Sequence, residues 1–157
     1  MNAHRVKPLK FPWPSLLYGL AILGAVLLGR LHPIPVYQSH GWATVIAGSV
    51  LIVLALSLNT WAIATVINRR LAVKRQKFPN HLIMCGPFRY TRNPVYLGHT
   101  IMTIGFGLIS LNPWFFVLAI LAVIVITAFA IRRQERHLLS RFGVEFEKYC
   151  RSTTRWI

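Results

Sequence analysis

Acidic residues are nearly missing from this 157-residue chain, which has three glutamates, no aspartate, and 18 lysines and arginines. The formal charge of +15 raises the hypothesis of a nucleic-acid-binding protein, but no recognition-helix or RNA-binding motif accompanies it. The sequence favours another use of the charge, in which basic residues fix the orientation of a membrane protein and contact anionic headgroups. Nucleic acid is therefore not an expected partner.

Charge is also missing from three long stretches, residues 11–29, 31–68 and 93–131. About 20 apolar residues are enough to cross the hydrocarbon of a bilayer. Together with a hydrophobic content of 55%, these stretches exclude a soluble domain and predict an all-α, polytopic membrane helical bundle. The third stretch is divided by Asn112-Pro113 into a helical hairpin. The four predicted transmembrane helices cover about residues 15–31, 42–67, 95–111 and 114–131.

Basic residues precede the first span, fill the loop 68–94 and follow the fourth span, whereas the two other loops contain only Arg30. The positive-inside rule then places both termini and the loop 68–94 in the cytoplasm. Residues 132–150 have apolar residues at helical spacing, with Gly143 as an interruption. They are predicted to form a cytoplasmic amphipathic helix, or two short ones, and the whole chain is one domain, 1–157.

Cysteine is scarce as well, with one residue in the loop 68–94 and one in the C-terminal segment. Both Cys85 and Cys150 fall on the predicted cytoplasmic side, where a structural disulfide is not expected. Neither has a partner at metal-ligand spacing, so no metal site is expected.

The first of the three glutamates, Glu135, lies just beyond the fourth predicted span. One interpretation is a surface salt bridge with Arg132 or Arg136. The other is that this carboxylate lies near a membrane cavity lined with arginines, where it binds a cationic or polar ligand. The sequence leaves both interpretations open.

The densest polar cluster lies where the loop 68–94 meets the third span, and residues 86–98 read Gly-Pro-Phe-Arg-Tyr-Thr-Arg-Asn-Pro-Val-Tyr-Leu-Gly. Such hydrogen-bonding capacity at the start of a membrane helix indicates a functional site. Together with Gln134-Glu135 and the segment through Gly143 to Tyr149, it resembles the isoprenylcysteine carboxyl methyltransferase and phospholipid methyltransferase superfamily. The resemblance covers about residues 80–149.

This resemblance implies an integral-membrane enzyme that moves a methyl group from S-adenosylmethionine to a lipophilic or membrane-associated acceptor, a carboxylate, amine or thiol. The implied catalytic residues are Arg92, Asn93, Glu135 and Arg133, with Arg132 as the alternative to Arg133 facing the substrate. The implied cofactor-binding residues are Asn80, His81, Leu82, Ile83, Gly86, Phe88, Arg89, Asn93, Pro94, Val95, Tyr96, Gly98, Gln134 and Glu135.

The residue types suit this cofactor. Arg89 or Arg92 can bind a carboxylate with two parallel hydrogen bonds. The rings of Phe88, Tyr90 and Tyr96 offer aromatic faces to adenine or to the sulfonium cation. Gly98 permits the close approach of a helix backbone.

Three positions depart from the family pattern, because Asn93 replaces its histidine, Phe88 its tyrosine and Gln134 the first of two glutamates. Asparagine can hydrogen-bond but cannot carry a proton. His81 and His99 are candidate substitutes, although a packed, neutral His99 is favoured.

Two alternative functions stay open. One is a membrane reductase that uses NADPH, a family with a similar motif that has a glutamate where this chain has His99. The other is a non-catalytic membrane protein with a degenerate cofactor site. Neither the methyl acceptor nor the oligomeric state is specified by the sequence.

Overall fold

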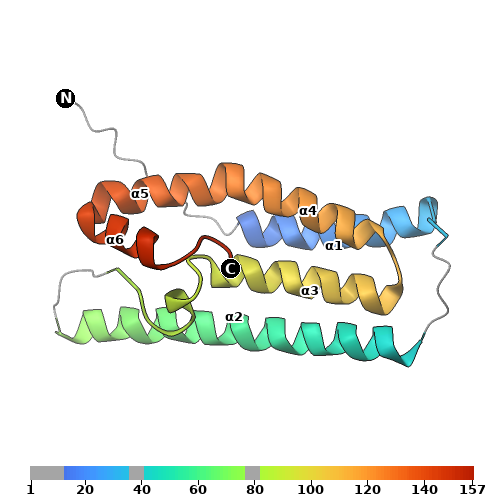
Figure 1. Cartoon of the computed structure of the whole chain (residues 1–157), viewed down its shortest axis with the longest axis horizontal. Helices are drawn as coiled ribbons and strands as arrows, with labels where there is room; N and C mark the ends of the chain where they lie inside the picture. Colours follow the sequence, from blue (N-terminus) through green and yellow to red (C-terminus); the bar gives the residue numbers. More distant parts are fainter. Residues whose placement is uncertain (1–12, 36–40, 77–81) are drawn as a thin grey trace.

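The computed structural model describes residues 13–35, 41–76 and 82–157, which form helices joined by loops, with no β-strand among them. Four helices run back and forth in contact with one another (Figure 1). They are α1 (Trp13–Leu31), α2 (Trp42–Gln76), α3 (Pro94–Ser110) and α4 (Trp114–Val125). The predicted all-α fold is confirmed for the described residues.

Three helical segments are long and apolar enough to cross a membrane, namely Trp13–Leu31, Trp42–Leu71 and Trp114–Phe142. They contain the first, second and fourth predicted spans. The helix α3 is apolar but has only 17 residues. The structure thus supports an integral membrane protein, and a fourth crossing by α3 stays a prediction.

Two helix boundaries differ from the sequence-based spans. The helix α2 continues past Ile67 to Gln76. The helix α4 leads without a break through the π-helix η2 (Ile126–Ile131) into α5 (Arg132–Phe142). No glycine or proline lies between residues 114 and 142, so the change from apolar to charged residues does not interrupt the backbone. The chain turns instead at Gly143, as predicted, where φ is +51°, and α6 (Val144–Ser152) follows.

Small residues allow α2 and α3 to pack closely. A Cβ atom on Gly105 would lie 2.9 Å from the carbonyl oxygen of Gly48. On Gly98 it would lie only 2.2 Å from Oδ1 of Asn59. Contacts of this kind are typical of membrane helix pairs, in which small residues let the backbones approach. Gly98 therefore serves the packing of α3 against α2.

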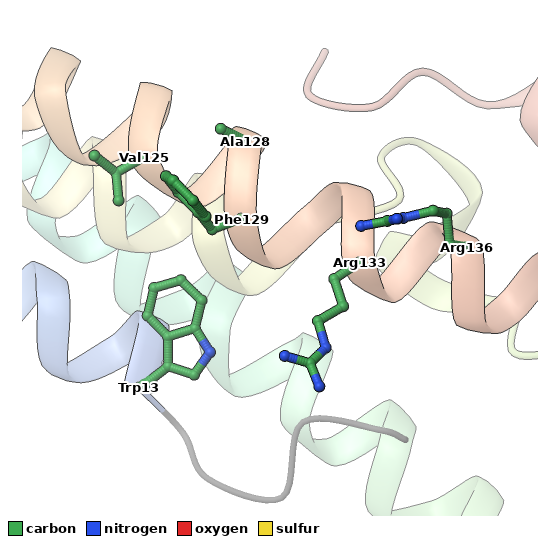
Figure 2. A pocket seen from close by; sticks show the side chains of 6 residues that line it. All are labelled: Trp13, Val125, Ala128, Phe129, Arg133 and Arg136. Carbon is green, nitrogen blue, oxygen red and sulfur yellow. The ribbon is translucent and has the colours of Figure 1, made fainter. Parts of the chain in front are cut away.

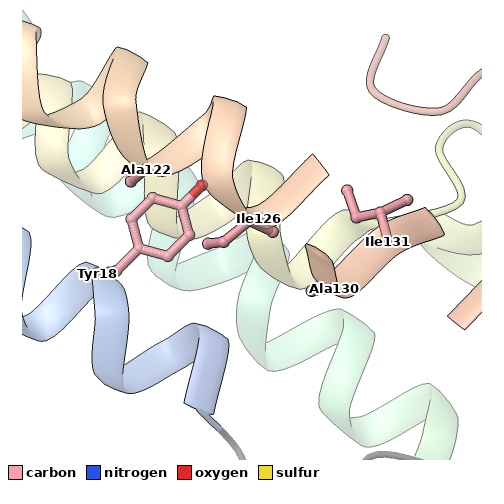
Figure 3. Packing of buried hydrophobic residues seen from close by; sticks show 5 residues of the cluster. All are labelled: Tyr18, Ala122, Ile126, Ala130 and Ile131. Carbon is pink, nitrogen blue, oxygen red and sulfur yellow. The ribbon is translucent and has the colours of Figure 1, made fainter. Parts of the chain in front are cut away.

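A small apolar core lies where α1 meets α4 and η2 (Figure 3). Its fully or almost fully buried members are Tyr18, Ala122, Ile126, Ala130 and Ile131. The Tyr18 hydroxyl lies 2.6 Å from Oγ1 of Thr100, which joins α1 to α3. Many large apolar side chains elsewhere on the helices are exposed, including Leu20, Ile46 and Ile120. This distribution suits a bundle whose outer surface contacts lipid, because lipid tails are as apolar as a protein core.

The polar segments gather at one end of the bundle, beyond the start of α3 (Figure 1). They are the loop 82–93 with its short 3₁₀ helix η1 (Gly86–Arg89), the helices α5 and α6, and the C-terminal residues 153–157. This end of the bundle carries the candidate site.

Candidate functional site

The loop before α3 is fixed on α2 by a glycine. Gly86 has φ of +62°, a conformation that side chains with a Cβ rarely adopt. A Cβ atom there would also lie 2.7 Å from Oγ1 of Thr65 on α2. The ring of Tyr90 lies 6.5 Å from that of Trp61, also on α2. Gly86 thus has a structural role in seating η1 against the bundle.

The helix α3 begins at Pro94, and Asn93 before it is non-helical, with φ −130° and ψ 54°. Proline disfavours the helical conformation in the residue before it. The chain therefore breaks at Asn93, and the helix starts directly after it. The Asn93 side chain is buried, and its Nδ2 donates to the carbonyl of Arg155 at 2.9 Å.

The C-terminal residues are bonded to this loop through the backbone. The Arg92 amide donates to the Thr154 carbonyl at 3.0 Å, and Thr91 forms an isolated parallel β-bridge with Thr154. Oγ1 of Thr91 donates to the carbonyl of Arg155 at 3.3 Å. Together with the Asn93 bond, these contacts place Arg155 beside Arg92.

A buried tyrosine on α6 adds a further anchor. The Tyr149 hydroxyl donates to the Phe88 carbonyl at 2.5 Å. Burial raises the pKa of this phenol to about 12, and the nearby positive charge of Arg92 opposes the shift. Tyr149 therefore stays neutral and keeps its donor at physiological pH.

Glu135 lies at the centre of the resulting cluster. Its Oε1 accepts from Nη1 of Arg92 at 2.9 Å and from Nε of Arg155 at 3.1 Å, and its Oε2 accepts from Nη2 of Arg155 at 2.8 Å. The side chains of Glu135 and Arg92 are only 17% and 14% exposed. The hydrogen bond to Glu135 raises the pKa of Arg155, so this guanidinium stays charged.

The salt-bridge partners of Glu135 differ from those expected. Arg132 and Arg136, the neighbours on the same helix, are exposed, and Arg132 forms no bond to Glu135. Glu135 instead faces the loop and the C-terminal residues, because its side of α5 packs toward them. The ion pairs thus join distant segments of the chain rather than one helical turn.

A cavity of about 880 Å³ opens beside this cluster. Its walls come from the loop, η2, α5, α6 and the C-terminal residues. The lining residues are Arg92, Ala128, Arg132, Glu135, Arg136, Leu139, Phe146, Glu147, Cys150, Arg151 and Arg155. Five arginines and two glutamates make the lining strongly basic, so it favours anionic groups. Glu135 adds a carboxylate that accepts hydrogen bonds.

Of the residues proposed from sequence, Arg92 and Glu135 line this cavity, and Arg132 does so in preference to Arg133. Arg133 lines a second cavity of about 570 Å³ (Figure 2). Asn80 and His81 lie outside the described residues. The other described members of the proposed set are not among the lining residues: Leu82, Ile83, Gly86, Phe88, Arg89, Asn93, Pro94, Val95, Tyr96, Gly98 and Gln134.

Several of these residues have visible structural roles instead. The side-chain amide of Asn93 donates to the carbonyl of Arg155. The backbone carbonyl of Phe88 accepts from the Tyr149 hydroxyl. His99 is packed, as favoured, with Nδ1 2.6 Å from the Val95 carbonyl. Asn93 and Phe88 thus shape the loop whose arginine reaches the cavity.

Sequence reasoning missed Arg155 and the packing of Cys150, whose Sγ lies 2.8 Å from Nη1 of Arg92. Spacing gives no signal for Arg155, because 20 residues separate it from Glu135 and 43 residues separate Glu135 from Arg92. The scarcity of acids is the one available signal. With three glutamates among 18 basic residues, a buried carboxylate shared by more than one arginine is to be expected.

Comparison with known families places this arrangement in context. Residues 43–145, more than half of the chain, match the model of a family described as phospholipid methyltransferase. The chain belongs to the phospholipid methyltransferase family. This membership confirms the resemblance stated from the sequence, and the matched range contains the loop before α3 and Glu135.

One curated relative is the protein-S-isoprenylcysteine O-methyltransferase of Saccharomyces cerevisiae. It is 29% identical over 137 residues, which cover 84% of this chain and 57% of the relative. The chain therefore spans a little over half the length of that protein. No solved structure matches the chain.

Proposed function

We propose that this phospholipid methyltransferase family member is an integral-membrane methyltransferase that takes its methyl group from S-adenosylmethionine. The acceptor is a lipophilic, membrane-associated molecule. The family match over residues 43–145 carries the proposal. The name of the yeast relative, an O-methyltransferase for isoprenylcysteine, agrees with it.

The cavity of about 880 Å³ fits the cofactor in size and in chemistry. Small-molecule sites have volumes of about 300–1,000 Å³ and combine apolar walls with a few placed polar groups. Leu139 and Phe146 give apolar surface for the base, and the arginines suit the cofactor carboxylate. Nε of Arg92 is buried without a hydrogen-bond partner among the described residues, so the protein leaves this donor unused.

Glu135 has one acceptor site to offer. An ionised carboxylate has about four lone-pair sites, and Glu135 uses three of them on Arg92 and Arg155. The remaining site can accept from the ammonium or a ribose hydroxyl of the cofactor. The two arginines meanwhile keep the carboxylate in one orientation, so ligand binding does not have to fix it.

The bound cofactor supplies an electrophilic methyl group on a sulfonium sulfur. The protein contributes position, because methyl transfer is an in-line displacement whose rate depends on holding two reactants in line. Arg132 is the arginine that we assign to the acceptor, since it lines the cavity and Arg133 does not. It suits a carboxylate or another anionic group on the acceptor.

The acceptor has access from the bilayer. Ala128 lines the cavity and lies within the segment Trp114–Phe142, which is long and apolar enough to cross a membrane. The cavity wall is thus continuous with a membrane-facing helix. A lipophilic acceptor can reach the cavity sideways without leaving the lipid.

The proposal includes four crossings with both termini and the site in the cytoplasm, as the basic residues indicate. A membrane-impermeant thiol reagent tests this in a Cys85→Ser, Cys150→Ser background. From the cytoplasmic side it should label Ser140→Cys, and from the opposite side Ile34→Cys. The reverse pattern would refute the orientation.

Calorimetry of the detergent-solubilised protein tests the function. S-adenosylhomocysteine, S-adenosylmethionine and NADPH are titrated separately, and methyl transfer from radiolabelled S-adenosylmethionine to a membrane extract is then measured. Binding of both S-adenosyl compounds with transfer to a lipid-soluble product is the expected result. NADPH binding would favour a reductase, and binding of none of the three would favour a non-catalytic protein.

A further inference from the structure

A second cavity, of about 570 Å³, lies between the start of α1 and the continuous helix α4–η2–α5. Trp13 approaches it from α1, and Phe129 and Arg133 approach it from the other helix (Figure 2). The remaining lining residues are Val125, Ala128 and Arg136. None of the functions proposed above uses this cavity.

The lining residues change from apolar to basic along the helix. Val125 and Phe129 come first, and Arg133 and Arg136 follow in α5. Val125 and Arg133 are roughly two helical turns apart along the helix axis. An acyl chain and the phosphate above it follow the same order, from apolar to anionic. Trp13 has the amphipathic ring that is common at membrane interfaces.

None of the three glutamates forms a salt bridge with Arg133 in the described part of the chain. All three glutamates are among the described residues, and Glu135 is occupied by Arg92 and Arg155. Within that part of the chain Arg133 takes part in no salt bridge. Arg133 is therefore open to an anion from outside the chain, and anionic headgroups are abundant at a membrane interface.

We propose that this cavity binds an anionic phospholipid. The phosphate lies on Arg133 and Arg136, and the upper part of one acyl chain lies along Val125, Phe129 and Trp13. Guanidinium groups bind phosphate oxygens with strong, charge-assisted hydrogen bonds. The lipid here is a bound component and not the methyl acceptor, so the proposal is independent of methyl transfer and requires only a membrane-embedded protein.

Trp13 provides a reporter inside the cavity. Phosphatidylglycerol brominated near the top of its acyl chains is titrated into the detergent-solubilised protein, and tryptophan fluorescence is recorded. Saturable quenching is expected, and it should shrink in Trp13→Phe while the quenching of the other tryptophans persists. Brominated phosphatidylcholine should bind at least about fivefold more weakly, because its headgroup has no net charge. Equal affinity for the two lipids in the wild-type protein would overturn the proposal without any variant.

Two variants of equal charge separate the cavity from the general basic surface. Arg133→Gln should weaken phosphatidylglycerol binding about fivefold or more. Arg141→Gln removes the same charge from the same helix, but Arg141 does not line this cavity, and its affinity should equal that of wild type. If both variants weakened phosphatidylglycerol binding equally, the effect would come from the general surface charge, and a specific site at Arg133 would be refuted.

The remaining occupants are distinguished by competition. Glycerol 3-phosphate at millimolar concentration should leave the quenching unchanged, and full displacement would show a site for a soluble phosphate ester instead of a lipid. Absence of saturable quenching would show that another part of the chain or a second copy fills the cavity, which also overturns the proposal.

Discussion

The substitution Glu135→Gln tests whether the cluster needs the negative charge of Glu135 or only its hydrogen bonds. Glutamine keeps the shape of the side chain, but it removes the negative charge and turns one of two acceptor oxygens into a donor. The three hydrogen bonds from Arg92 and Arg155 then face at least one amide hydrogen. Two guanidinium groups would remain close together, and the one on Arg92 is only 14% exposed.

The expected cost follows from this burial. Breaking a fully buried ion pair costs roughly 3–5 kcal/mol. Because Arg155 is 39% exposed and water can solvate it, we expect a loss of about 2–3 kcal/mol in the free energy of unfolding. The loss of a hydrogen bond to a charged group should also weaken S-adenosylmethionine binding roughly tenfold or more.

Two assays on detergent-solubilised protein measure the two effects, denaturant unfolding followed by circular dichroism and calorimetric titration with S-adenosylhomocysteine. Glu145→Gln is the matched control, because Glu145 is exposed and does not line the cavity. It should change stability by less than about 0.5 kcal/mol and leave binding unchanged. Equal effects of the two substitutions would refute a special role for Glu135, and lost stability with intact binding would make the cluster purely structural.

The three remaining predictions concern the loop, the C-terminal anchor and the helix interface. Arg92→Lys should leave the protein folded, because lysine keeps the positive charge that faces Glu135. It should nevertheless lower methyl transfer strongly, because lysine lacks the Nε donor and the planar guanidinium. Wild-type turnover of radiolabelled methyl groups would remove Arg92 from the site. Tyr149 has its pKa raised from 10.0 to about 12, so its neutral form stabilises the fold below pH 10 and this contribution declines as pH rises from 10 to 12. Tyr149→Phe should cost about 1 kcal/mol at pH 7 and flatten the alkaline decline in thermal stability, and an unchanged decline would assign it to other groups. Gly98→Ala should destabilise the protein by about 1–3 kcal/mol, because its Cβ would lie 2.2 Å from Asn59 Oδ1, and Asn59→Ala should restore part of this loss in a double-mutant cycle followed by thermal melting.

Much of the fold is predictable because lipid imposes simple requirements on the sequence. Each membrane helix needs a long run without charge, and the three charge-free stretches located α1, α2 and the α3–α4 hairpin. Helix ends were less predictable, since they depend on the backbone rather than on polarity. The helix leading from α4 crosses from apolar to charged residues at Arg132 without ending, and it stops only at Gly143.

The candidate site was predictable in its two principal members and not in their pairing. The motif order identified Arg92 and Glu135, which the structure brings into contact. It did not identify Arg155, because that arginine arrives through backbone hydrogen bonds from the C-terminal residues to the loop. Pairing of this kind has no periodicity, and propensity or spacing cannot reveal it.

Which of Arg132 and Arg133 lines the cavity beside Glu135 depends on the helical register, which could not be predicted from the sequence. Consecutive residues on an α-helix point roughly 100° apart, so one position of register decides which side of the helix an arginine occupies. The π-helix η2 lies directly before them and alters that register, because each of its turns holds more residues than an α-helical turn. In the observed register Arg132 lines the cavity beside Glu135 and Arg133 lines the cavity beside Trp13, whereas Arg136 and Ala128 border both. One helical wall thus separates the cavity that we assign to methyl transfer from the cavity that we assign to an anionic lipid. The two adjacent arginines therefore border different cavities, to which we assign different ligands.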